Sequence, residues 1–364
     1  MKVKDITRAL EQWAPPSYQE SYDNSGLIVG EPEQEIHQVL ISLDVTEEVI
    51  EEAVNMGAQL IVAHHPLIFG GVKRISSGHW VGRCLQMAIK NDISIYAIHT
   101  NLDNVYTGVN RMLAERIGLT DLSILAPRRN TLEKLVTFLP ENASERVQKA
   151  LFEAGAGRIG EYDQCSFVTV GTGSFRPSQH ANPTIGTPGK TEKVSESRVE
   201  VLVPAHLQGE ILSALFQAHP YEEVAYYLTP LDNMNQTVGA GMFGKVAEEK
   251  DFGVFLADLK ESMNLVTLKH TKLVHERVQK VAVCGGAGRF LLKDAINSGA
   301  QVFITSDFKY HDFFEANNRI VIVDIGHYES EVYTKDLIGN YLRQKFTNIA
   351  FHLTRVDTNP ISYL

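Results

Sequence analysis

A short segment from the first half of the chain returns in its last third. Residues 57–64 (GAQLIVAH) align with residues 299–306 (GAQVFITS), 242 positions later. Each segment follows a stretch in which apolar and charged residues alternate with helical period. An amphipathic helix that leads through glycine into an apolar strand is a typical part of an α/β fold. The chain therefore contains the same supersecondary unit in two distant places.

A second match keeps the order of the first. Residues 93–98 (ISIYAI) align with 320–325 (IVIVDI), and 104–107 (NVYT) align with 331–334 (EVYT), at an offset of 227. The two offsets differ, and chance matches arise among βα units because strand, glycine and amphipathic helix recur in them. The kept order and the repeated Val-Tyr-Thr favour duplication. We therefore expect two similar α/β lobes.

Strands and helices alternate around both copies of the repeat. After a first helix at 3–13, the pattern predicts strands 39–43, 60–63 and 93–98 with helices 47–56, 81–91 and 109–117, and later strands 280–283, 302–305 and 320–324 with helices 289–298 and 331–344. This alternation predicts βα units and a parallel or mixed sheet covered by helices.

The segment between the two copies has a different pattern. It predicts strand 135–139, helix 143–154, strand 165–171, strand 197–203, helix 207–218 and strand 224–228. This βαββαβ order is that of a ferredoxin-like unit, and the Gly- and Pro-rich residues 175–195 are expected to form a mobile loop. The predicted fold class is α/β, with two similar α/β lobes forming one discontinuous domain (1–126 and 239–364) and an inserted ferredoxin-like α+β domain (127–238).

Composition limits the class of protein. With 364 residues and 44% hydrophobic content, the chain can bury a large core. The three cysteines share no disulfide or metal-site spacing, which favours a reducing, cytoplasmic location. Residues 1–8 carry charges where a signal peptide needs an apolar core, and no apolar run approaches the roughly 18 residues of a membrane helix. The formal net charge of −10 argues against nucleic acid as the main partner.

Metal-binding side chains follow several of the predicted strands. His64 and His65 end the first repeated strand, Asp103 follows the next strand, and His327 and Glu331 lie in the equivalent region of the second copy. Consecutive residues on an extended backbone point to opposite sides, so His64 and His65 would hold different ions. The alternative is that His-His-Pro is simply a polar strand terminus. Five donors together favour a site for two metal ions.

The chemistry of the donors limits which metals could bind. Mixed nitrogen and oxygen ligands suit zinc, iron, manganese or nickel, and cysteine ligation is not expected because no cysteine falls beside these strand ends. Glu331 is the expected bridge, since the pattern places it in a first helical turn and the i, i+4 spacing puts it on the face of His327. Five ligands for two ions would leave coordination positions open for water or substrate.

The same motifs are similar to those of a known family. The segments 64–66 (HHP), 99–103 (HTNLD) and 326–331 (GHYESE), with the loop 23–27 (DNSGL), resemble the NIF-three-like family of GTP cyclohydrolase I type 2 homologues, or dinuclear metal-centre hexameric proteins. Residues 218–223 (AHPYEE) resemble the PII-like insertion of its longer members. Tyr22 stands where many members have tryptophan. The resemblance implies metal ligation by His64, His65, Asp103, His327 and Glu331, two divalent metal ions per chain, and a homohexamer built as a trimer of dimers.

Two classes of function stay open at this point. The first is a metal-dependent hydrolase acting on a nucleotide, pterin or related small molecule, and the resemblance implies GTP ring opening; the second is a non-catalytic metal-binding or regulatory assembly. No catalytic residue is assigned, although His99, His311 and Tyr328 are candidate acid–base or substrate contacts. Residues 284–289 (CGGAGR) lack a phosphate-loop spacing and predict a tight turn. Residues 309–312 (KYHD) either line the same cleft or form an exposed loop.

Overall fold

The computed structural model describes residues 1–364, which divide into two compact units. The first unit consists of Met1–Pro127 and Thr237–Leu364, and the second is the inserted segment Arg128–Gln236. None of the helices combines the length and the apolar character that crossing a membrane requires.

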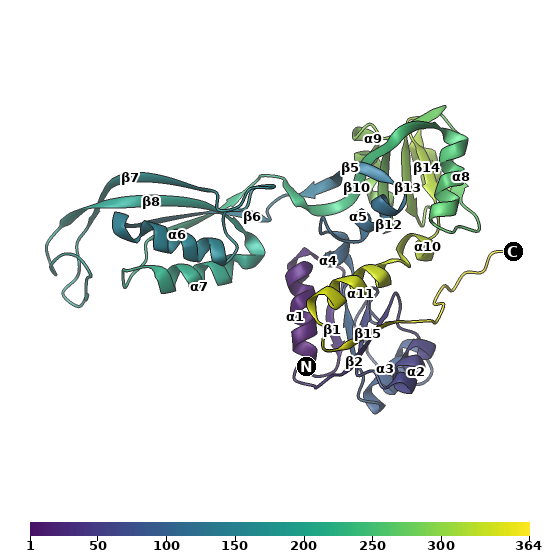
Figure 1. Ribbon diagram of the computed structural model, residues 1–364, viewed down its shortest axis with the longest axis horizontal. Helices are drawn as coiled ribbons and strands as arrows, with labels where there is room; N and C mark the ends of the chain where they lie inside the picture. The colour runs from purple at the N-terminus through teal and green to yellow at the C-terminus, as the bar shows by residue number, and fades with distance from the viewer. The chain divides into compact units, whose positions relative to one another are not determined.

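A five-stranded sheet forms one half of the first unit (Figure 1). Its order is β1-β4-β3-β2-β15, in which only β1 runs antiparallel to its neighbour. The strands are β1 (Gly26–Val29), β2 (Gln38–Ser42), β3 (Leu60–Ala63), β4 (Ser94–Ala97) and β15 (Ala350–Leu353). Helices α1 (Val3–Trp13) and α11 (Thr334–Lys345) pack on one face, while α2 (Glu47–Met56) and α3 (Trp80–Lys90) pack on the other. The central strand β3 is apolar throughout because both of its faces are covered.

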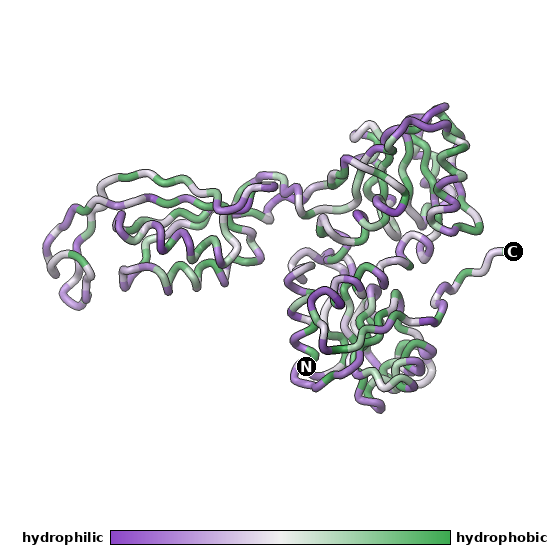
Figure 2. The backbone as a smooth tube through the Cα atoms, in the orientation of Figure 1, coloured by the Kyte–Doolittle hydropathy of each residue, from purple (hydrophilic) through white to green (hydrophobic).

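A six-stranded sheet forms the other half of this unit. Its order is β11-β14-β13-β12-β10-β5, and β12, β13 and β14 are parallel. The strands are β5 (Leu119–Arg128), β10 (Asn235–Asp251), β11 (Lys269–His270), β12 (Arg277–Ala287), β13 (Val302–Ser306) and β14 (Val321–Asp324). Helices α5 (Val109–Arg116) and α8 (Phe252–Ser262) cover one face, and α9 (Leu292–Asn297) covers the other. Figure 2 shows that hydrophobic residues run along the central strands of this sheet.

The strand register follows the offsets of the sequence repeat. Leu60 of β3 pairs with Ser94 of β4, and Val302 of β13 pairs with Val321 of β14. Leu60 and Val302 are 242 positions apart, and Ser94 and Val321 are 227 positions apart, which are the offsets of the two sequence matches. Because parallel strands carry their carboxyl ends to the same sheet edge, the residues after β3, β4, β13 and β14 occupy corresponding places in the two halves.

Local sequence signals explain where α2 and β3 begin and end. The Thr46 side chain accepts a hydrogen bond from the Val49 amide at 3.3 Å, which caps the start of α2. Gly57 ends the helix in the left-handed conformation, with φ of 72°. The chain therefore enters β3 at Leu60, and the strand delivers His64 and His65 immediately beyond its end.

Several elements differ from the sequence expectation. The helix expected at 331–344 is two helices, α10 (His327–Glu331) and α11, and the helix expected at 289–298 starts as a 3-10 turn before α9. Strands β5, β10, β11 and β15 and helix α8 were not predicted. The short remaining elements are α4 (Thr100–Asp103), η1 (Pro16–Tyr18), η2 (Glu141–Ala143), η3 (Ala205–Leu207), η4 (Arg289–Leu291) and η5 (Asp312–Ala316).

The inserted unit has the predicted βαββαβ order. Its elements are β6 (Leu132–Pro140), α6 (Ser144–Glu153), β7 (Ser166–Phe175), β8 (Glu192–Pro204), α7 (Gln208–Ala218) and β9 (Tyr226–Leu231). The antiparallel sheet has the order β7-β8-β6-β9, and both helices cover one face of it (Figure 1). The β7 and β8 strands extend further than expected, which shortens the loop between them to residues 176–191.

Candidate metal centre

His64 is a fully buried histidine at the carboxyl end of β3. Its relative exposure is 0%, and its backbone N–H donates to the Ser42 carbonyl at 3.2 Å. Ring atom Nδ1 lies 2.8 Å from the carbonyl oxygen of Ile98, the residue after β4. Because a carbonyl can only accept, Nδ1 carries the proton and Nε2 offers a lone pair. The fold therefore presents Nε2 of His64 as a ready metal ligand.

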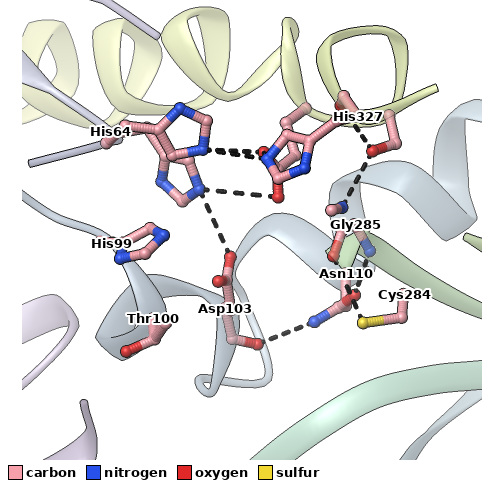
Figure 3. A network of polar contacts seen from close by, with 12 residues as sticks. His64, His99, Thr100, Asp103, Asn110, Cys284, Gly285 and His327 are labelled. Atoms are coloured by element: carbon pink, nitrogen blue, oxygen red, sulfur yellow. Dashed lines mark hydrogen bonds and ion pairs between the residues drawn. The ribbon is translucent and has the colours of Figure 1, made fainter. Parts of the chain in front are cut away.

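Asp103, the last residue of α4, faces this nitrogen. The distance between His64 Nε2 and Asp103 Oδ1 is 3.6 Å, too long for a hydrogen bond (Figure 3). Both atoms are buried, and neither has a hydrogen-bond partner. The Asn110 side chain donates to the Asp103 carbonyl at 2.9 Å and so fixes the backbone there. Two unsatisfied ligand atoms aimed at one another fit a cation between them.

A second group of donors forms around Glu331. Its Oε2 atom lies 3.0 Å from His65 Nε2 and 2.9 Å from His327 Nε2, and the two nitrogens are 3.4 Å apart. The other ring nitrogens are held by carboxylates, since Nδ1 of His65 lies 2.7 Å from Asp44 and Nδ1 of His327 lies 2.7 Å from Asp307. Carboxylates behind histidines orient metal ligands in many proteins. These contacts suit a second cation.

Glu331 is common to both groups. Its Oε1 atom lies 4.0 Å from His64 Nε2, while Oε2 contacts His65 and His327. Glu331 belongs to two of the three groups of possible ligands, His64 with Asp103 and Glu331, and His65 with His327 and Glu331. The third group combines His64, His65 and His99. The arrangement suits a carboxylate that bridges two ions. Gly286 allows its close approach, because a Cβ there would lie 2.3 Å from Oε1.

Glu331 does not lie in the first helical turn where the sequence pattern placed it. Glu331 is the last residue of α10, not part of the first turn of a long helix, so the helix dipole does not favour its charge there. The i, i+4 relation to His327 holds because the helix begins at His327 itself.

Burial and neighbouring charges shift the pKa values of the donors in different directions. Burial lowers the pKa of His64 to about 3, and burial together with the Glu331 charge raises the pKa of Asp103 well above its usual value. Burial also opposes the charged form of His65, but hydrogen bonds to Asp44 and Glu331 outweigh it and raise its pKa to about 9. His327, held by Asp307 and Glu331, has a pKa raised to about 11 against the same burial. Cations bound here would take the place of protons.

His99 adjoins the centre and has its own carboxylate partner. Its Nδ1 lies 2.7 Å from Asp23 Oδ1, and its ring centroid lies 5.3 Å from those of His64 and of His65. Asp23 also accepts from the Thr100 backbone N–H at 3.0 Å and from the Thr100 hydroxyl. Burial opposes ionisation of Asp23, but the His99 contact outweighs it and lowers the pKa of the carboxyl. His99 was predicted as a candidate contact, but Asp23 was not predicted as its partner.

Four of the five donors, all except His64, line a cavity of about 410 Å³. Aromatic side chains of Tyr22, Phe69 and Phe290 line it and are largely exposed, and residues 359–361 of the C-terminal segment also contribute. Tyr328 is a further lining residue, and burial together with a hydrogen bond to Asp357 raises its pKa to about 12.

Cys284 also lines this cavity. The expectation that no cysteine falls beside the strand ends was therefore wrong, because β12 runs on to Ala287 and brings Cys284 to the site. Burial raises the pKa of its thiol well above the usual value, and the charges of Asp103 and Glu331 add to the effect. Cys284 belongs to neither group of ligand atoms around Glu331.

The other candidate loop lies outside the cavity. Residues 309–312 do not line it; Tyr310 and His311 are exposed, and Asp312 pairs with Arg289 at 2.8 Å. Of the two alternatives for this segment, the exposed loop is correct. The glycine segment after Cys284 continues β12 instead of forming the tight turn that was expected, and Gly285 and Ala287 face the cavity.

Comparison with known proteins places the chain in a family. The profile of the Duf34/NIF3 (NGG1p interacting factor 3) family matches residues 1–360. A protein named "GTP cyclohydrolase 1 type 2 homolog" from Halalkalibacterium halodurans is 37% identical over 364 residues, which span 99% of this chain and 98% of the relative. One from Bacillus subtilis is 36% identical over 367 residues, with the same coverage. The chain therefore belongs to the Duf34/NIF3 family, which confirms the resemblance noted in its sequence.

Solved structures agree with this assignment. A Bacillus cereus protein related to NIF3 matches with a TM-score of 0.90 and 38% identity, covering 100% of this chain and 99% of that one. A Staphylococcus aureus protein matches with a TM-score of 0.79 and 29% identity over the same shares of the two chains. The mixed α/β fold is thus the fold of NIF3-related proteins.

Proposed function

We propose that the protein is a metal-dependent hydrolase that binds two divalent metal ions per chain and acts on a nucleotide or a related small molecule. His64, Asp103 and Glu331 would hold one ion, and His65, His327 and Glu331 the other. The observation that carries the proposal is the pair of buried, unpartnered atoms His64 Nε2 and Asp103 Oδ1 beside a shared carboxylate.

The donor set limits the metal and its chemistry. Imidazole and carboxylate ligands suit zinc, iron, manganese or nickel. Two such ions would supply Lewis-acid activation of water and stabilisation of negative charge that develops on the substrate. Five donors for two ions would leave coordination positions open for water or substrate.

The cavity lining favours a substrate with a planar ring. Tyr22, Phe69 and Phe290 offer exposed aromatic faces around the donors, and such faces stack on heteroaromatic rings. The relatives named as GTP cyclohydrolase 1 type 2 homologues make guanine nucleotides the first substrates to test.

His99 is the residue we assign to proton transfer. Because Asp23 engages Nδ1, the Nε2 atom of His99 is left for substrate or water in the cavity. Asp23 acts as a positioning residue that fixes the ring. His99 is also close enough to His64 and His65 to be a metal ligand, so metal content has to be measured alongside turnover.

A substrate screen tests the proposal. The protein is reconstituted separately with zinc, manganese, iron(II) and nickel and incubated with GTP, other nucleotides, pterins and phosphoesters, and the products are identified by mass spectrometry. We expect turnover of at least one ring-containing substrate. His64→Ala should abolish it, whereas His180→Ala, which removes an exposed histidine of the inserted unit, should not.

The screen also discriminates between the two classes of function. Metal binding without turnover of any of these compounds would overturn the hydrolase and favour a non-catalytic metal-binding assembly. Turnover that survives His64→Ala would move the reaction away from this centre.

Self-association into a homohexamer is a further part of the proposal. Tyr310 and Phe314 are 74% and 67% exposed with ring centroids 5.6 Å apart, and contact between copies of the chain would cover this apolar pair. Light scattering at micromolar concentration is expected to report a mass near six chains. A stable monomer would contradict it.

A further inference from the structure

The inserted unit has a cavity of its own, formed entirely by residues of that unit. Its volume is about 510 Å³, within the range of small-molecule sites. It lies where β7 and β8 lead into the loop 176–191, and the segment 221–227 forms another part of its wall. No residue of the candidate metal centre contributes to it.

A buried carboxylate faces this cavity. Glu196 of β8 is only 9% exposed, and the Tyr221 hydroxyl donates to its Oε1 atom at 3.0 Å. Its Oε2 atom accepts no hydrogen bond from the protein, and a Cβ on Gly173 would lie 1.8 Å from it. Because Gly173 has no side chain, it leaves room for Oε2, which accepts no hydrogen bond from the protein. Oε2 is not fully buried and Glu196 lines the cavity, so this atom is a candidate contact for a ligand.

Two pairs of aromatic rings line the same cavity as Glu196. Phe175 and Tyr221 have ring centroids 6.5 Å apart, and Phe138 and Tyr227 are packed edge to face at 5.7 Å. All four residues line the cavity. Aromatic faces near a carboxylate attract organic cations, because the ring quadrupole and the negative charge act in the same direction.

The charged side chains around the cavity also favour a cation. Three glutamates line it, Glu196, Glu222 and Glu223, against a single arginine, Arg176. Arg176, Glu222 and Glu223 are exposed, so Glu196 is the charge that is removed from solvent. The cavity therefore favours a cationic group over an anionic one.

The loop 176–191 closes over the cavity through specific contacts. The Thr184 hydroxyl donates to the Pro220 carbonyl at 3.0 Å, and the Asn182 N–H donates to the Glu222 carboxylate at 3.0 Å. Pro183, Thr184 and Ile185 form part of the lining. The segment expected to be a mobile loop is thus anchored to the segment that carries Tyr221, and it gives the cavity an apolar wall.

From this combination we infer that the inserted unit binds a small organic cation, a primary ammonium or guanidinium group attached to an apolar or aromatic body. The cationic group pairs with Oε2 of Glu196, and the body lies among Phe138, Phe175 and Tyr227. The site is separate from the metal centre and gives the inserted unit a ligand-binding role.

Titration of the full-length protein with four probes of similar size tests this inference. Benzylamine and phenylguanidine carry the cation, benzyl alcohol is neutral and benzoate is an anion. Saturation-transfer NMR and isothermal titration calorimetry should detect the two cations with dissociation constants at least about tenfold lower than those of the alcohol and benzoate, as expected for a charge-assisted hydrogen bond. Glu196→Gln should weaken cation binding about tenfold or more.

Two glycines of β7 provide a matched pair of variants that keep the charge. Gly173→Ala places a methyl group against Oε2 of Glu196 and should weaken cation binding, whereas Gly171→Ala meets no atom within 4 Å and should not. His64→Ala, which removes a donor of the metal centre, should leave probe binding unchanged. Circular dichroism checks that each variant is folded.

Four results would overturn the inference. They are equal binding of the neutral or anionic probe, cation affinity unchanged by Glu196→Gln, loss of binding in His64→Ala, and no cation binding at millimolar concentration. The last result would leave the Glu196–Tyr221 hydrogen bond as a structural link only.

Discussion

The side chains of His64 and Asp103 face one another across 3.6 Å with no hydrogen bond between them. Leaving a buried polar atom unsatisfied costs about 1–3 kcal/mol, and more for a charged group. Two such atoms side by side would therefore lower the stability of the folded protein when no ligand is bound. A cation bound between them would remove the penalty for both atoms, and Glu331 would link this ion to the donors His65 and His327.

Removing the carboxylate behind one metal ligand should weaken the binding of one ion. Asp307 holds Nδ1 of His327 at 2.7 Å and has a φ of 60°, a conformation that asparagine tolerates. Asp307→Asn removes the charge behind His327 and should lower affinity for one of the two ions by about 10–100-fold. Competition with a chromophoric chelator measures this, with Asp312→Asn, outside the cavity, as the control. An unchanged affinity would remove Asp307 from a supporting role.

The inserted unit should be dispensable for folding of the first unit, Met1–Pro127 with Thr237–Leu364. A Cβ on Gly239 would lie 2.2 Å from the Ala126 carbonyl, so the chain leaves and re-enters this unit at neighbouring points. Replacing residues 128–236 by a short Gly/Ser linker should give a folded protein that retains its metal content. Elemental analysis and thermal unfolding measure the outcome. An insoluble or metal-free product, under conditions where the full chain is neither, would show that the two units share a core.

Acid should destabilise the inserted unit through His219. Nδ1 of this buried histidine accepts from the Tyr221 N–H at 3.1 Å, so Nε2 carries the proton and donates to the Phe138 carbonyl at 3.0 Å. Burial lowers the pKa of His219; the Phe138 carbonyl and Glu196 oppose this effect, and Arg146 adds to it. The unfolded chain then binds the proton more readily, and stability falls as pH drops below about 6.5.

Hydrogen exchange followed by mass spectrometry tests this pH dependence. Peptides from α7 and β9 should lose protection between pH 7.5 and pH 5.5 after correction for intrinsic rates. The loss should be smaller in His219→Gln and unchanged in His180→Gln, which alters an exposed histidine. Equal losses in both variants would exclude His219 as the cause.

Elements with strong local signals were predictable from the sequence. Helix α2 and strand β3 have the predicted bounds, because Thr46 caps the helix, Gly57 ends it and the strand is apolar throughout. Strand β10 was missed, since its 17 residues include three glycines and several charged residues that conceal any alternation. The break between α10 and α11 was missed because Val332 and Tyr333 are compatible with a continuous helix.

The candidate site was predictable where donors directly follow strands. His64 and His65 come after β3, and the parallel register then brings Asp103, His327 and Glu331 towards them. The carboxylates behind the histidines, Asp23, Asp44 and Asp307, were not predicted, because their partners lie 20 or more positions away in sequence. Asp44 and Asp307 also follow strands, so the same signal could have found them.

Metal content per chain tests the central claim most directly. Reconstituted protein, freed of unbound metal by gel filtration, is analysed for zinc, manganese, iron and nickel beside His64→Ala, His327→Ala and Glu331→Ala. If Glu331 bridges the two groups, the parent protein holds close to two ions, each histidine variant keeps about one, and Glu331→Ala loses both. One ion or none in the parent with every metal, or a Glu331→Ala variant that keeps as much metal as His327→Ala, would contradict the account.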